Sequence, residues 1–182
     1  MNRWQLHLAI KTLQSGGVIA YPTESVFGLG CDASNLKAVA KILSIKKRSY
    51  KKGLILLVSD IQQAFPYINQ LSQAQIKKIN EKNSRATTWL IEKNYMLSPL
   101  LSGEHLKLAV RVTSHPIAKI LCESINRPIV STSCNLNGKP TSVKTCVVRN
   151  KNKINIDGVL SGVCSGQQAS RIIDLETMKV FR

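Results

Sequence analysis

The pattern of hydrophobic positions changes along the chain between a helical period and short continuous runs. Apolar residues recur at helical spacing over residues 3–14, and Gly16 and Gly17 end that helix. Residues 18–21 form a short continuous apolar run, which is typical of a buried strand. Helices and strands that alternate over one core predict the α/β class.

The same pattern predicts the other elements. Further helices are expected over residues 36–45, 61–68, 72–80 and 116–124. Further strands are expected over residues 54–58, 87–91, 106–112 and 129–130, with apolar pairs at 147–148, 159–160, 172–173 and 180–181 completing the sheet. The chain contains no internal repeat and no linker-like stretch, so residues 1–182 are predicted to form one domain.

Composition narrows the classes of function. No apolar run approaches the roughly 20 residues that cross a bilayer, and the first residues lack the apolar stretch of a secretion signal, so a cytoplasmic protein without membrane contact is expected. The five cysteines and three histidines are scattered without ligand spacing, so neither a disulfide framework nor a metal site is predicted. Lys and Arg number 26 against 10 Asp and Glu, and the net charge of +16 favours nucleotides, RNA or another polyanion without choosing among them.

Two polar segments in the first third of the chain are candidates for ligand binding. Tyr21 to Gly28 reads Y-P-T-E-S-V-F-G and follows a predicted strand, where α/β proteins present ligand-binding loops, although a turn with capping side chains explains this segment alone. Lys46 to Gly53 is a basic run that suits phosphate groups, and a solvated surface is its alternative. The chain has no P-loop and no complete dinucleotide fingerprint, so any ATP site must be of another kind.

Two later segments add polar groups to predicted strands. Arg111 lies in an aliphatic strand, where an unpaired charge is costly, so it should point into a polar cleft or pair with an acid. His115 precedes Pro116 and is expected to open a helix rather than to catalyse. Residues 131–135 read S-T-S-C-N, a strand end that can hold a ligand by hydrogen bonds or cap its own turn. No base and acid accompany these serines as a nucleophilic set would require.

In order and spacing, the four segments resemble the YrdC-like threonylcarbamoyl-AMP synthase family. The family's Y-P-T-E-x-V-F-G, K-x-R, V-R-V before His-Pro, and S-T-S-A-N elements correspond to residues 21–28, 46–48, 110–116 and 131–135, with Cys134 in place of alanine. The resemblance covers roughly residues 3–182. Residues 84–88 replace the family's P-G-P-x-T turn and Ser49 replaces a proline, changes that would loosen a cleft wall or slow turnover.

The resemblance implies a single-domain YrdC-like twisted sheet with flanking helices and a basic concave cleft. It also implies an activity. L-threonine and bicarbonate form a carbamate that attacks the α-phosphorus of ATP, giving threonylcarbamoyl-AMP and pyrophosphate. Separate tRNA-modifying transfer proteins then pass the group to an adenosine beside the anticodon. Mg²⁺ would be bound through the ATP phosphates, and weak binding of RNA or tRNA is a secondary expectation.

The resemblance assigns ligand-binding roles to individual residues, and no side chain is expected to act as a covalent catalyst. ATP is assigned to Lys46, Arg48, Lys52, Ser133, Asn135, Thr141 and Ser170. Threonine is assigned to Thr23, Arg111 and Ser131.

Two other functions fit parts of the sequence. A non-catalytic module that binds double-stranded RNA or tRNA explains the charge, but it does not explain why the hydroxyl-rich turn accompanies the basic run. An enzyme that carbamoylates or acylates another amino acid would share the fold and the same polar segments.

Overall fold

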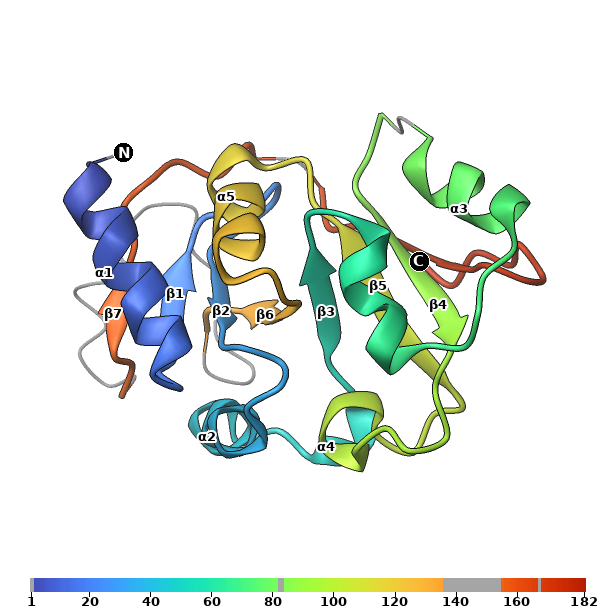
Figure 1. The fold of residues 1–182 in the computed structure, drawn as a ribbon, viewed down its shortest axis with the longest axis horizontal. Coiled ribbons are helices and arrows are strands. Elements are labelled where there is room, and N and C mark those ends of the chain that lie inside the picture. The colour runs from blue at the N-terminus through green and yellow to red at the C-terminus, as the bar shows by residue number, and fades with distance from the viewer. Residues whose placement is uncertain (1, 82–83, 136–154, 167) are drawn as a thin grey trace.

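The apolar runs pair into a single mixed sheet in the computed structural model of the chain, which describes residues 2–81, 84–135, 155–166 and 168–182. Among these residues the strand order is β7-β1-β2-β6-β3-β5-β4-β8. The strands are β1 (Ile19–Tyr21), β2 (Gly28–Gly30), β3 (Ile55–Val58), β4 (Thr87–Glu92), β5 (Lys107–Val112), β6 (Ile129–Ser133), β7 (Gly158–Val159) and β8 (Arg171–Asp174). Figure 1 shows the sheet with helices around it, which confirms the predicted α/β class.

Helices and short 3₁₀ turns connect the strands. The α-helices are α1 (Arg3–Gln14), α2 (Leu36–Lys46), α3 (Gln73–Asn80), α4 (Pro99–Ser102) and α5 (Pro116–Ile125). The 3₁₀ segments are η1 (Tyr50–Lys52) and η2 (Ile61–Tyr67). Polar caps fix several of these ends: Asn35 accepts from the Ala38 N–H at the start of α2, and Ser72 forms a capping box with Gln75 at the start of α3.

Strand β6 joins the two halves of the sheet because it pairs on both sides. Its end pairs antiparallel with β2, with Gly28 opposite Ser133, and its beginning pairs antiparallel with β3, with Ile55 opposite Ser131. Strand β3 continues in parallel to β5, where Leu57 lies opposite Arg111. The hydroxyl-rich segment therefore lies at the centre of the sheet.

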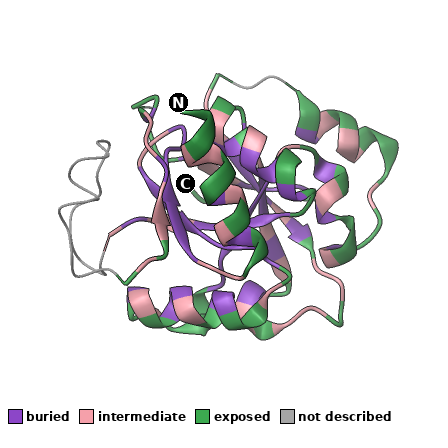
Figure 2. Ribbon diagram, turned by 60° about the vertical axis from the view of Figure 1, so that its left-hand side comes forward, coloured by how far each residue is buried: buried purple, intermediate pink, exposed green. Residues whose placement is uncertain are grey.

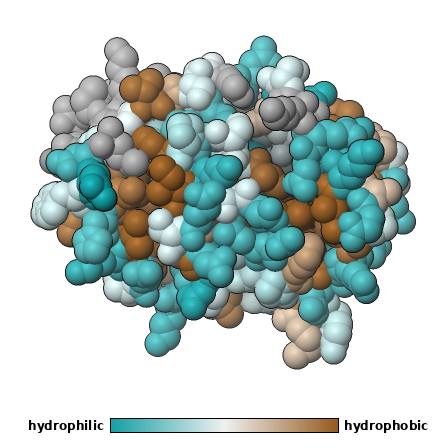
Figure 3. Space-filling model, turned by 45° about the horizontal axis from the view of Figure 1, so that its top comes forward, coloured by the Kyte–Doolittle hydropathy of each residue, from teal (hydrophilic) through white to brown (hydrophobic). Residues whose placement is uncertain are grey.

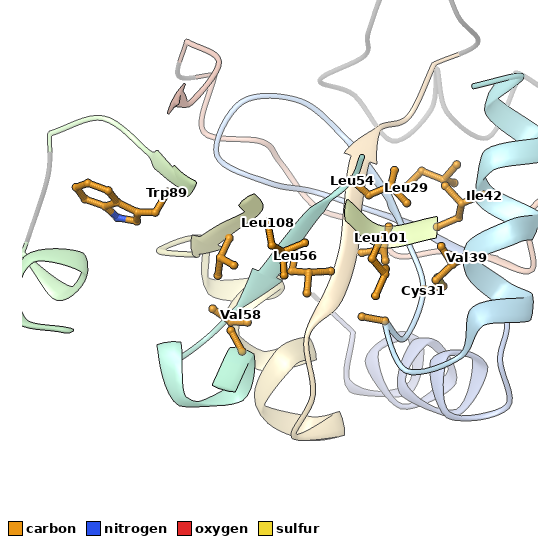
Figure 4. Close-up of a cluster of buried hydrophobic side chains, with 14 of the residues drawn as sticks. Leu29, Cys31, Val39, Ile42, Leu54, Leu56, Val58, Trp89, Leu101 and Leu108 are labelled. Carbon is orange, nitrogen blue, oxygen red and sulfur yellow. The ribbon is translucent and has the colours of Figure 1, made fainter. Parts of the chain in front are cut away.

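Two apolar clusters cover the two faces of the sheet. Helices α1 and α5 lie side by side in Figure 1 and pack on one face, in a cluster that includes Leu13, Leu57, Leu121 and Ile129. The larger cluster, shown in part in Figure 4, packs α2 and α4 against residues of the other face such as Leu56. Figure 2 shows the buried residues along the strands and on the inner sides of the helices, while the outer sides are exposed. Burial of apolar surface on both faces is the main force that holds the sheet in this arrangement.

The structure corrects several expected elements. Residues 61–68 were expected as an α-helix but form the 3₁₀ segment η2, which contains Pro66, a residue that lacks the N–H of an α-helical bond. Residues 28–30 form a strand that the pattern did not predict, and β6 extends past residue 130 to Ser133. The expected pair at 180–181 makes only an isolated bridge between Val180 and Ile173, and the pair at 147–148 lies outside the described residues.

Two expectations from composition can be compared with the residues that the structure describes. None of their helices is both long enough and apolar enough to cross a membrane. Their four cysteines, Cys31, Cys122, Cys134 and Cys164, are all buried. Burial raises the pKa of the Cys31 and Cys122 thiols to about 12, so both stay protonated at neutral pH.

Candidate functional site

The end of α2 holds the hydroxyl-rich turn through one buried lysine. Lys46 is 5% exposed, and its Nζ donates to the carbonyl oxygen of Ser133 at 2.6 Å, to Asn135 Oδ1 at 2.8 Å and to the Asn135 carbonyl oxygen. Ser133 Oγ donates to the same Asn135 Oδ1 at 2.6 Å. Burial lowers the pKa of the Lys46 ammonium, but three acceptors around one nitrogen favour its charged form. Lys46 therefore joins two segments that the sequence keeps far apart.

Arg48 follows Lys46 at the point where α2 turns into the next segment. Helix α2 ends at Lys46 and is capped by Lys47, whose φ of 47° is left-handed, and this turn carries Arg48 toward η1. Its Nη2 donates to the carbonyl oxygens of Gly53 at 3.0 Å and Lys52 at 3.3 Å. Its Nε is buried and has no hydrogen-bond partner in the described part of the chain. Arg48 is half-buried and its charge acts on Lys46, while Lys52 is exposed in η1 and accepts from Arg48 through its carbonyl oxygen.

Two residues assigned to threonine converge on Gly28. A Cβ placed on Gly28 would lie 3.1 Å from Thr23 Cγ2, 3.2 Å from Tyr21 Cζ and 3.4 Å from Ser131 Oγ. The missing side chain therefore lets the strand approach Thr23, Tyr21 and Ser131 closely. Thr23 Oγ1 donates to the Val26 carbonyl oxygen at 2.7 Å, which fixes the loop between β1 and β2.

The same loop carries a buried carboxylate across to the end of β5. Glu24 is 1% exposed, and its Oε1 accepts from Thr113 Oγ1 at 2.6 Å, Ser114 N at 3.0 Å and His115 N at 3.3 Å. Burial alone would raise the pKa of the Glu24 carboxyl, but the charge of Arg111, the Thr113 hydroxyl and the backbone N–H donors hold it below its usual value. Arg111 is 7% exposed and lies near enough to act on Glu24, yet the two make no direct ion pair. Sequence reasoning gave Glu24 no role, and the only available signal was a carboxylate in the polar segment that follows a buried strand.

Ser170 lies in a different part of the sheet from Lys46. Its hydroxyl is 2.9 Å from Thr88 Oγ1, and both residues are buried. The register that places Trp89 opposite Val110 also places Thr88 opposite Arg111. Ser170 therefore lies near Arg111. It is far from the turn that Lys46 holds at the end of β6, because β3, β5 and β4 lie between β6 and β8.

The other expectations about the site concern Thr141, a concave cleft and a metal ion. Thr141 lies outside the described residues and its role stays a prediction, as does the basic concave cleft. Two surface depressions of about 120 and 640 Å³ share no residue with the candidate site. The described residues contain no group of three or more His, Cys, Asp or Glu side chains placed to hold a metal ion.

Fold and site together define a mixed α/β protein with polar and cationic groups converging at its strand ends. Residues 11–182 match the Sua5/YciO/YrdC family, whose description reads "Telomere recombination". The chain therefore belongs to the Sua5/YciO/YrdC family.

Relatives and solved structures extend this similarity over nearly the whole chain. A threonylcarbamoyl-AMP synthase of Saccharophagus degradans is 41% identical over an alignment 187 positions long, covering 100% of this chain and 98% of the relative. One of Photobacterium profundum is 42% identical over 165 residues, covering 90% of this chain and 89% of the relative. The structure of E. coli YciO superposes with a TM-score of 0.80 at 26% identity, covering 100% of this chain and 89% of that one.

One solved structure contains an amino acid. P. abyssi Sua5 complexed with L-threonine superposes with a TM-score of 0.85 at 26% identity. The match covers 97% of this chain and 52% of that chain, so this chain spans about half the length of P. abyssi Sua5.

Proposed function

We propose that the chain is an L-threonylcarbamoyladenylate synthase. The nitrogen of L-threonine loses protons and joins the carbon of bicarbonate, with release of water, to form a carbamate. A carbamate oxygen then attacks the α-phosphorus of ATP, and pyrophosphate leaves as threonylcarbamoyl-AMP forms. The observation that carries the proposal is the identity of about 40%, over almost the entire chain, to relatives named threonylcarbamoyl-AMP synthase.

The cationic side of the site suits the nucleotide. Arg48 keeps donors beyond the two carbonyls that it binds, and together with Lys52 it would contact phosphate oxygens. Lys46 would fix Ser133 and Asn135 in position for the nucleotide and supply positive charge beneath the phosphates. Ser170 and Thr141 stay proposed contacts of ATP.

The side near Gly28 suits the amino acid. The Thr23 side chain and the Ser131 hydroxyl both lie close to Gly28 and would contact threonine, and the Arg111 guanidinium would pair with the threonine carboxylate. Such a site performs little covalent chemistry. Its contribution is orientation, charge neutralisation around phosphate and protection of the carbamate from water.

The cofactor and partners belong to the same proposal. Mg²⁺ would be held by ATP phosphates and water, as this ion prefers, and would neutralise charge on the phosphates. The product would pass, in the cytoplasm, to separate proteins that modify adenosine next to the tRNA anticodon. Weak RNA or tRNA binding would follow from the net charge of +16.

A direct test measures pyrophosphate release from ATP. Release should require both L-threonine and bicarbonate, and it should proceed without RNA. Equal release when either substrate is omitted would refute the proposal, and release only after tRNA is added would favour an RNA-dependent reaction instead. Mass spectrometry of products formed from a mixture of amino acids separates threonine from any other amino acid substrate.

The alternative of a non-catalytic RNA-binding module makes the opposite prediction. Such a module needs charge but has no need for a buried Glu24 carboxylate beside Arg111 or for the Thr23 and Ser131 side chains gathered at Gly28. RNA binding without threonine-dependent pyrophosphate release would support it.

A further inference from the structure

Three neighbouring buried groups keep hydrogen-bonding positions unfilled. Within the described residues, Glu24 Oε2, Arg111 Nε and His115 Nδ1 are buried and have no hydrogen-bond partner. The residues are 1%, 7% and 4% exposed. A buried polar atom without a partner costs free energy, so several in one place call for a ligand or another explanation. The His115 N–H donates to Glu24 Oε1, and the charge of Arg111 acts on Glu24, so the three residues are neighbours where the β1–β2 loop contacts the end of β5.

The hydrogen bonds that these residues make within the protein show which of their other atoms can still accept or donate. Glu24 Oε1 already accepts three hydrogen bonds from residues 113–115, whereas Oε2 of the same carboxylate accepts none. His115 Nε2 lies 3.0 Å from the Val163 carbonyl oxygen, which can only accept, so a neutral ring carries its proton on Nε2 and leaves Nδ1 as an acceptor. The site therefore offers one carboxylate acceptor, one guanidinium donor and one imidazole nitrogen.

This set complements an amino acid zwitterion. A guanidinium suits a carboxylate, and a buried carboxylate oxygen without a partner suits an ammonium group. We infer that Glu24 determines specificity by accepting a hydrogen bond from the substrate's α-ammonium group through Oε2, while Arg111 faces the substrate carboxylate. The inference rests on the proposed function and deepens it. It adds an anionic contact to a threonine pocket otherwise made of hydroxyls and an arginine.

The contact has a consequence for substrate choice. The site should prefer threonine over its 2-hydroxy analogue, in which a hydroxyl replaces the ammonium. The hydroxyl can still donate to Oε2 but carries no positive charge, so the loss of the ammonium–carboxylate attraction should weaken binding roughly tenfold or more. Once the ammonium has released its proton to solvent, the contact weakens and the neutral amine is free to react with bicarbonate.

The experiment compares binding of L-threonine and its 2-hydroxy analogue by calorimetry, with ATP present and bicarbonate absent so that no product forms. Wild-type protein should bind threonine at least tenfold more tightly than the analogue. Glu24→Gln keeps a carbonyl oxygen for the Thr113 and backbone donors but replaces Oε2 with an amide nitrogen that cannot accept. This variant should lose most of the preference, with ATP affinity changed less than twofold.

A matched control separates ligand binding from loop structure. Thr113→Val removes a hydrogen bond to Glu24 Oε1 and leaves Oε2 intact, so it should keep the preference for threonine. Equal effects of Glu24→Gln and Thr113→Val would make Glu24 a structural tether and overturn the inference. Wild-type protein that binds both ligands equally would also overturn it, even if Glu24→Gln failed to fold.

The outcomes also distinguish the inference from the proposed function. Threonine-dependent product formation by wild type together with an unchanged preference in Glu24→Gln would refute only the role of Glu24. A wild type that binds no threonine and forms no product would overturn both.

Discussion

Replacing Lys46 with methionine removes one ammonium group and keeps an unbranched stem in its place. In the native protein this ammonium donates to two carbonyl oxygens and to one side-chain oxygen of the 133–135 turn. Hydrogen bonds from a charged donor contribute about 1.5–3 kcal/mol each, but three bonds to one nitrogen are not additive. We expect Lys46→Met to lower the free energy of unfolding by about 2–4 kcal/mol, or roughly 5–15 °C in melting temperature.

The assay is thermal unfolding at neutral pH, followed by pyrophosphate release at varied ATP concentration. Lys37→Ala is the matched control because it removes an exposed lysine from the same helix, and it should change stability by less than about 0.5 kcal/mol. Lys46→Met should also lower kcat/KM for ATP at least tenfold, because Ser133 and Asn135 lose their support. A Lys46→Met protein that melts within about 1 °C of wild type would refute the claim that the ammonium holds the turn.

The remaining predictions concern threonine, salt and pH. Arg111→Lys keeps the charge but loses the planar fork, so it should raise the KM for threonine roughly tenfold or more and that for ATP much less, as steady-state kinetics would show. Any RNA affinity should fall steeply with added salt in filter binding, and an affinity indifferent to salt would contradict an electrostatic origin. Burial alone would raise the pKa of Asp174, but Lys107 and backbone donors lower it to about 2. The carboxylate therefore stabilises the fold above about pH 4 and loses this effect as the pH falls toward 2, so the difference in melting temperature between wild type and Asp174→Asn should shrink over that range.

The regular elements were predictable because their apolar residues repeat at the period of the element. Helix α1 and strand β3 carry clear patterns and were located to within about one residue. Strand β2 was missed because Gly28, Leu29 and Gly30 show neither alternation nor an apolar run, and the strand forms by pairing with β1 and β6. Segment η2 was expected as an α-helix because its apolar spacing fits both helix types, whereas the Pro66 ring and its missing N–H favour the 3₁₀ form.

The candidate site was predictable in composition but not in contacts. Sequence reasoning selected Lys46 as a phosphate ligand, but whether a lysine donates to phosphate or to backbone carbonyls depends on neighbours 87 and 89 residues away. Glu24 shows the same limit, because its partners lie about ninety residues later at the end of β5. The type of a residue shows which groups it can bind. Which of those groups it binds in the folded protein depends on the tertiary structure.

The order of strands explains why four distant segments can act together. Four segments are involved: the loop after β1, the turn before β3, the residues of β5 and the end of β6. They are separated by up to about 110 residues, yet β2, β6, β3 and β5 are consecutive in the sheet. Strand β6 is inserted between β2 and β3 although it follows β5 along the chain, and this insertion brings Ser131 and Ser133 between the loop that carries Thr23 and the basic turn at Lys46.

Most of the face shown in Figure 3 is hydrophilic, with hydrophobic residues in separate groups. Exposed cations on such a surface are screened by water and salt, whereas a buried cation interacts more strongly with a ligand. The cations that matter most for the proposed reaction are therefore the buried ones near the strand ends, Lys46 and Arg111.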